Sequence, residues 1–123
     1  MGKATQNAKA AEGNKAHEPN DYDVILKDGV FVLSKPYKFE GGPERTVLDF
    51  PLKDMTGQHI RTAQRHYETL EGRLTGLAEL NKSYQAYIAA ALMDVNPDFV
   101  FNLPAQDFTD LTTCVQRFLA YWG

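Results

Sequence analysis

Cysteine is nearly absent from this chain of 123 residues, and a basic excess and a long apolar run are absent as well. The single cysteine, Cys114, excludes an internal disulfide framework and a zinc site built from several thiolates, and it fits a reducing cytoplasm. No stretch approaches the roughly 18 apolar residues of a membrane span. Residues 1–20 also lack the apolar segment of a secretion signal. We therefore predict a cytoplasmic protein without membrane association.

The formal net charge of −3 at pH 7 argues against a nucleic-acid partner. Proteins that bind nucleic acid carry a clustered basic face, which this composition does not indicate. The nearest approach is Arg61 and Arg65, which are four residues apart and share one face of a predicted helix. Such a pair either contacts an acidic or phosphate group or is solvated beside Glu68. We predict no nucleic-acid partner and keep Arg61 and Arg65 as candidate contacts with another protein.

Composition divides the chain into two parts. Residues 1–20 contain no aromatic and no branched aliphatic side chain, so they cannot bury enough surface to offset the chain entropy lost on folding. We predict a disordered N-terminal tail there. Residues 21–123 are predicted to form a single domain of the α+β class, an N-terminal β-hairpin followed by a small bundle of about three α-helices.

Alternating apolar residues predict the hairpin. One parity of segment 30–39 is apolar or aromatic: Phe31, Leu33, Tyr37 and Phe39. Segment 45–50 alternates in the same way, and the glycine pair at 41–42 permits positive φ in the loop. Pro36 lacks a backbone donor, so segment 30–39 is predicted to be an edge strand, which is also a candidate subunit contact. A two-stranded hairpin is marginal alone, so its apolar face needs helices to pack on.

Three longer segments have helical periodicity. The first begins after Thr56, a suitable N-cap, and glycines at 72 and 76 end it. The second contains the strongly helix-favouring run AYIAAALM at 86–93. Asn96 and Pro97 then read as an N-cap and first helical residue of a short turn, after which the last helix covers QDFTDLTTCVQRFLAYW at 106–122. The ordered chain is expected to begin near Tyr22, and residues 27–29 are expected to form a turn before the first strand.

Residues with reactive side chains do not form a catalytic or metal-binding pattern. His59 and His66 are about 10.5 Å apart along a helix, too far to share a metal directly. Cys114 falls on an apolar stripe and is predicted to be a buried, inert thiol. The aspartates of the C-terminal half sit at helix ends and turns, where aspartate acts as a cap. We predict no enzyme activity, no cofactor and no metal.

The aromatic content is large for so small a domain. We expect some rings to face a partner, and this favours a protein that either self-associates or covers an apolar helix of another protein. The candidate partner-facing rings are Tyr84, Tyr87, Phe99 and Phe101. The residues assigned to the core are Tyr67, Phe108, Leu111, Val115 and Phe118.

Three segments in this order resemble a known family: VLSKPYKFEGGPERTVLDF at 32–50, PLKDMTGQHIRTAQR at 51–65, and LPAQDFTDLTTCVQRFL at 103–119. The chain is similar there to the small tail assembly chaperones of long-tailed bacteriophages. In that family a strand with Lys-Pro, a glycine-containing turn and a Leu-rich strand lead into a helix, and a Leu-Pro-x-x-Asp-Phe helix closes the chain. The resemblance covers roughly residues 30–121.

The resemblance implies a function that composition does not show. Members of the family bind the tape measure protein, keep it soluble and promote assembly of the tail tube in the host bacterial cytoplasm, without catalysis. They are absent from the mature virion, and in many phages they also exist as a frameshifted longer form that recruits tail tube subunits. We also predict that this chain self-associates. The alternative is a small structural tail or neck subunit that is retained in the virion.

Overall fold

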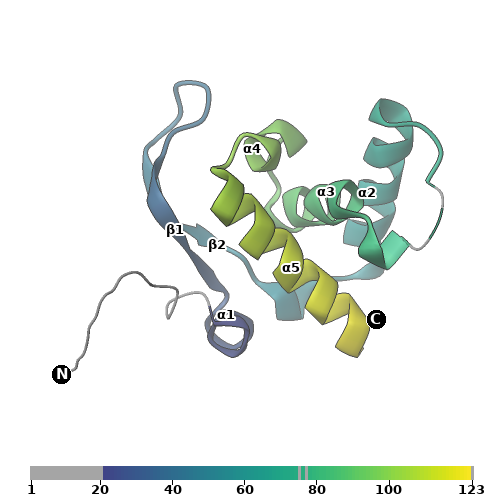
Figure 1. The fold of residues 1–123 in the computed structure, drawn as a ribbon, viewed down its shortest axis with the longest axis horizontal. Helices are drawn as coiled ribbons and strands as arrows, with labels where there is room; N and C mark the ends of the chain where they lie inside the picture. The colour runs from purple at the N-terminus through teal and green to yellow at the C-terminus, as the bar shows by residue number, and fades with distance from the viewer. Residues whose placement is uncertain (1–20, 75, 77, 123) are drawn as a thin grey trace.

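The computed structural model describes residues 21–74, 76 and 78–122. The predicted N-terminal tail, residues 1–20, lies outside the described residues. The described residues form a two-stranded sheet, and the longer helices all lie on one side of that sheet (Figure 1). The predicted α+β architecture with an N-terminal hairpin is confirmed.

The hairpin consists of β1 (Val30–Tyr37) and β2 (Arg45–Asp49), which pair antiparallel. Phe31 lies opposite Leu48 and both are buried, as the alternation predicts, because residues of one parity face the helices. The register shifts between Val32 and Tyr37, the stretch that contains the proline. Pro36 has no N–H donor, and a strand tolerates such a residue at an irregularity of this kind.

The described residues form five α-helices, more than the predicted three. They are α1 (Tyr22–Asp28), α2 (Gly57–Leu70), α3 (Lys82–Met93), α4 (Pro97–Phe101) and α5 (Ala105–Trp122), with short 3-10 turns at Leu52–Asp54 and Ala78–Leu80. The turn predicted after Asn96 is α4. The helix that the periodicity did not reveal is α1, whose seven residues give too short a window for a 3.6-residue pattern.

Capping residues set the helix limits. The Asp21 side chain accepts a hydrogen bond from the Asp23 N–H, and Gly29 ends α1 in the left-handed conformation at φ 68°. Thr56 precedes α2 and Asn96 precedes α4, where the Asn96 side chain accepts from the Asp98 N–H at 2.8 Å, so both predicted N-caps are confirmed. Asp21 and Gly29 were the signals from which α1 could have been found.

The third helix is the centre of the bundle. In Figure 1, α3 lies between α2 and α5, and it packs against both of them and against α4. Ala86, Ala89 and Ala90 are essentially fully buried. Their small side chains allow neighbouring helices to approach closely, which explains why most of α3 is inaccessible rather than amphipathic.

Candidate interaction surface

Aromatic rings from four helices form one internal chain of contacts. The rings run from Tyr84 to Tyr67, Tyr87, Phe101 and Phe108, with centroid separations of 6.1, 5.8, 5.4 and 5.7 Å. The first three contacts are edge-to-face, the arrangement that the quadrupoles of aromatic rings favour. These rings are spread over residues 67–108 of the sequence, and they serve largely to join the helices to one another.

Tyr84, Tyr87 and Phe99, which were predicted to face a partner, are buried within the chain. Their exposed fractions are 6%, 2% and 5%, and Phe101 is half-buried. Other rings cover them: Tyr67 packs against Tyr84 and Tyr87, and Tyr37 and Phe39 pack against Phe99. The Tyr87 hydroxyl donates to Glu71 Oε2 at 3.0 Å. Of the residues assigned to the core, Leu111 and Val115 are buried, and Tyr67, Phe108 and Phe118 pack against the core while half-buried.

The buried Tyr87 hydroxyl makes stability depend on pH under alkaline conditions. Burial, followed by the hydrogen bond to Glu71, raises the pKa of Tyr87 from 10.0 to about 12. Between these two values the unfolded chain has released the proton and the folded chain has not, so stability falls as the pH rises. We expect a loss of no more than about 2 kcal/mol across this window, because each pKa unit corresponds to about 1.4 kcal/mol and solvent screening reduces the effect.

Urea unfolding at a series of pH values between 9 and 12 measures this loss. Tyr87→Phe is the test variant, because phenylalanine keeps the ring contacts and has no proton to release. Its stability should decline less steeply than that of the unaltered chain; an equal decline would assign the effect to other groups, such as the Cys114 thiol, whose pKa burial raises to about 12.

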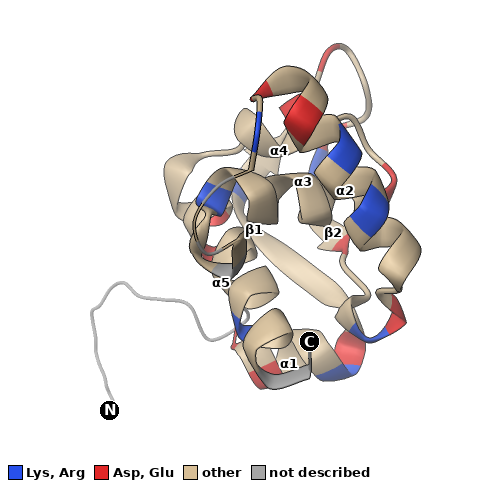
Figure 2. Ribbon diagram, turned by 90° about the vertical axis from the view of Figure 1, so that its right-hand side faces the viewer, with Lys and Arg blue, Asp and Glu red and all other residues tan. Residues whose placement is uncertain are grey.

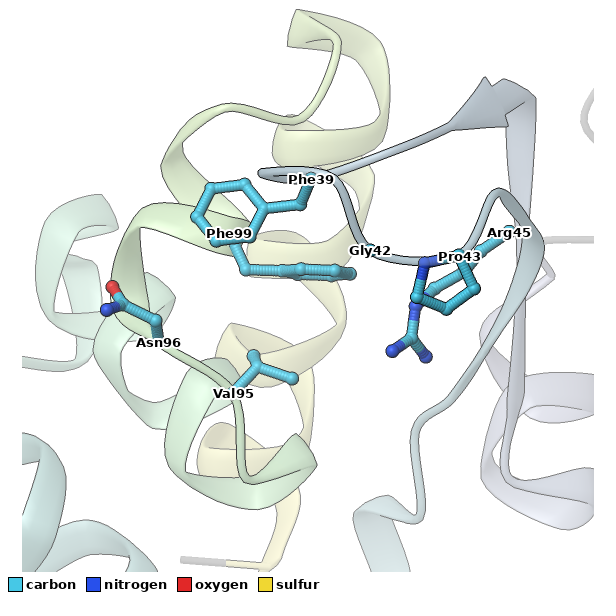
Figure 3. Close-up of a pocket in the computed structure, with 7 residues that line it drawn as sticks. All are labelled: Phe39, Gly42, Pro43, Arg45, Val95, Asn96 and Phe99. Atoms are coloured by element: carbon cyan, nitrogen blue, oxygen red, sulfur yellow. The ribbon is translucent and has the colours of Figure 1, made fainter.

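A cleft separates the hairpin loop from the segment that joins α3 to α4 (Figure 3). Its volume is about 210 Å³ and its lining is Phe39, Gly42, Pro43, Arg45, Val95, Asn96 and Phe99. Phe99 is held in place because its carbonyl accepts from the Tyr37 hydroxyl at 2.8 Å and its ring packs edge-on against Phe39 at 5.5 Å. The Arg45 guanidinium lies 5.4 Å from the centre of the Phe99 ring, a cation–π contact.

Two further hollows adjoin this cleft and share Val95 with it. One, of about 90 Å³, follows β2 and is lined by Arg45, Leu48, Asp49, Met93, Val95 and Phe99. The other, of about 450 Å³, lies between α2 and the end of α3 and is lined by His59, Thr62, His66, Ala90, Ala91, Leu92, Asp94 and Val95. Together the hollows are lined by a mixture of apolar side chains, such as Val95 and Phe99, and charged ones, Arg45, Asp49 and Asp94, which suits an apolar side chain flanked by polar groups.

The residues with reactive side chains stand apart from one another. His59 Nδ1 accepts a hydrogen bond from the Thr56 N–H at 2.9 Å, so this side chain helps to cap the N-terminus of α2. Cys114 is buried, as predicted, and the raised pKa keeps its thiol protonated and unreactive at neutral pH. Within residues 21–74, 76 and 78–122, no three His, Cys, Asp or Glu side chains come close enough to hold a metal ion.

Arg61 and Arg65 are exposed on α2. The basic positions of this helix follow one side of it (Figure 2). Neither arginine lines the three hollows, whose α2 residues are His59, Thr62 and His66. The six candidate contact residues therefore do not form one site: the arginines lie at the surface of α2, and the rings lie inside the bundle or beside it.

Among the side chains that the structure describes, four large apolar ones are exposed, and sequence periodicity did not single them out. Leu70, the last residue of α2, is 66% exposed, and Leu80, at the end of the turn before α3, is 60% exposed. Val24 on α1 and Val47 on β2 are 44% and 48% exposed. The two leucines lie at helix ends, where the periodic pattern stops, so no sequence signal distinguished them from core residues.

Comparison of the chain with protein-family models, with curated proteins and with solved structures gives no match. Among the described helices, none combines the length and apolar character needed to cross a bilayer.

Proposed function

We propose that this protein is a phage tail assembly chaperone, which binds and solubilises the tape measure protein and promotes tail tube assembly without catalysis in the host bacterial cytoplasm. The observation that carries the proposal is the order and spacing of the motifs at 32–50, 51–65 and 103–119. Each motif alone is a strand, turn or helix start of a kind found in many proteins, whereas all of them in this order are typical of that family.

The surface described above supports this proposal by supplying suitable contacts. A tape measure protein is a long helix with apolar faces, and such a helix is bound through apolar anchors placed in shallow hollows. Leu70 and Leu80 expose apolar area, and the cleft over Phe99 offers a hollow with a cation at its edge. Individually weak contacts of this size hold a long partner when many copies bind side by side. Arg61 and Arg65 remain candidate contacts for acidic groups of the partner.

Co-expression with the longest helical open reading frame downstream in the same genome tests the proposal. We expect that partner to become soluble only with this chain and to co-elute with many copies of it. The double substitution Leu70→Ser and Leu80→Ser should reduce the amount recovered, while Thr69→Ser, at an exposed neighbour, should not. A partner that stays insoluble in the presence of the unaltered chain would contradict the proposal.

The alternative is a structural tail or neck subunit, and the two functions differ in whether the protein is present in the completed virion. A chaperone leaves before the particle is complete, whereas a subunit remains in it. Mass spectrometry of purified virions is therefore expected to find no peptides of this chain. Stoichiometric recovery from virions would favour the structural subunit, as would rings or tubes formed by the chain alone.

A further inference from the structure

The two outer edges of the hairpin differ in what covers them. Phe50 N–H donates to Gly29 C=O at 2.7 Å, directly before β1 and after β2. In an antiparallel pair, every second residue of a strand directs its N–H and C=O groups toward the partner strand. Because Phe50 bonds in this way to Gly29, Leu48 also directs its backbone groups toward β1, whereas Val47 and Asp49 direct theirs away from it. The outer edge of β2 is thus formed by the N–H and C=O groups of positions 47 and 49.

The outer edge of β1 is occupied by α5. Asp107, in the first turn of α5 and fully buried, accepts hydrogen bonds from the Ser34 N–H at 3.0 and 3.2 Å and from Ser34 Oγ at 2.9 Å. On β2, by contrast, no described residue hydrogen-bonds the outward backbone groups of Val47 or Asp49. The edge predicted from Pro36 as a subunit contact is therefore partly covered, and the open edge is the other one.

The sequence of β2, Arg-Thr-Val-Leu-Asp, is complementary to itself when two copies run antiparallel. With Val47 opposite Val47 of a second copy, Arg45 of each strand lies opposite Asp49 of the other. The side chains of all three residues are exposed, although the Arg45 guanidinium turns back over the Phe99 ring, so the pairing brings the free backbone groups together and places opposite charges near both ends. A register shifted by two residues would break the pairing of the charges.

We propose that the free edge of β2 binds β2 of a second copy of this chain, giving an antiparallel four-stranded sheet in the order β1, β2, β2, β1. An unpaired edge strand is a template for such addition, and the two-fold symmetry makes the contact isologous. Arg45 and Asp49 both line the hollow along β2, together with Met93, Val95 and Phe99 of the helical layer, so both charges lie beside this strand.

The contact is small, and this sets the kind of dimer expected. The two-fold axis is perpendicular to the sheet, so both helical layers lie on one side and the hollows along β2, with Met93 and Val95, face each other. A five-residue strand pair with these hollows buries less than a standard stable interface. The dimer is therefore reversible and depends on concentration. It does not depend on the proposed function, because its parts are the strand's own charges and backbone groups.

Sedimentation equilibrium of the full chain over a wide concentration range tests the proposal. The mass is expected to rise from 13.8 kDa toward twice that value. Val47→Pro removes an outward N–H that β1 does not use, so it should weaken association at least tenfold while the hairpin persists. Val47→Thr keeps the N–H and should associate like the unaltered chain. Thermal unfolding followed by circular dichroism checks that each variant is folded.

Charge exchange provides the sharper test. Arg45→Asp and Asp49→Arg each place like charges opposite one another in the antiparallel register and should weaken association about tenfold. The double variant Arg45→Asp with Asp49→Arg restores complementarity at both ends and should recover most of the association. Three results would overturn the proposal: a monomer at every concentration, a dimer that Val47→Pro does not weaken, or a double variant no better than the single ones.

Discussion

Replacing Asp107 by alanine is expected to lower the free energy of unfolding by about 3 kcal/mol. This carboxylate is fully buried and joins α5 to β1, because both of its oxygens accept from Ser34. Alanine leaves the Ser34 N–H without its acceptor and removes a charge-assisted hydrogen bond. It also removes a negative charge from the first turn of a helix, where the helix dipole stabilises it.

Urea denaturation followed by circular dichroism at 222 nm measures the change. Asp107→Asn retains an oxygen for the Ser34 N–H and should lose about 1 kcal/mol, as should Ser34→Ala, which removes only the hydroxyl bond. Thr109→Ala, at an exposed position of the same helix, is the matched control and should be nearly neutral. If Asp107→Ala were as stable as Thr109→Ala, the bond to Ser34 would not contribute to holding α5 on the hairpin.

Phe31→Ala is expected to have the largest effect, a loss of about 4 kcal/mol. Phe31 has no exposed surface, lies opposite Leu48 in the hairpin, and packs edge-on against Phe50 with ring centroids 6.3 Å apart. Removing the ring leaves a cavity where the sheet meets the helices. A two-stranded hairpin has little stability of its own, so the loss also loosens both strands.

The midpoint of urea unfolding, with the slope held constant, reports this loss. Phe31→Leu fills most of the same volume and should lose about 1.5 kcal/mol. Val47→Ala on the exposed face of the hairpin should change stability by less than about 0.5 kcal/mol. Equal destabilisation by Phe31→Ala and Val47→Ala would contradict the assignment of the two faces of the sheet.

Part of the fold was predictable because its signals are local. The alternation in segment 30–39 assigned Phe31 to the inner face, and Thr56 and Asn96 marked the first residues of two helices. Each signal lies within a few residues of the feature that it specifies. Helix α1 was not predicted because seven residues are too few for a periodic pattern, although its N-cap Asp21 and its C-cap Gly29 were both present in the sequence.

The candidate contact residues were less predictable, since exposure depends on the rest of the chain. Tyr87 has the same side chain whether it faces a partner or a neighbouring helix, and only the packing of α2 and α4 around α3 buries it. Leu70 shows the opposite outcome, because it follows the apolar pattern of a helix and is nevertheless 66% exposed. Hydrophobicity alone does not separate these two cases.

The sequence by itself determined the hairpin, the presence of the longer helices and the lack of a disulfide framework, because each follows from side chains that are close together along the chain. Only the tertiary structure decided which aromatic rings are covered and which edge of the hairpin stays open. The contact that closes the β1 edge joins Ser34 to Asp107, which are 73 residues apart. Such a contact depends on the path of the whole chain, so no short window of sequence specifies it.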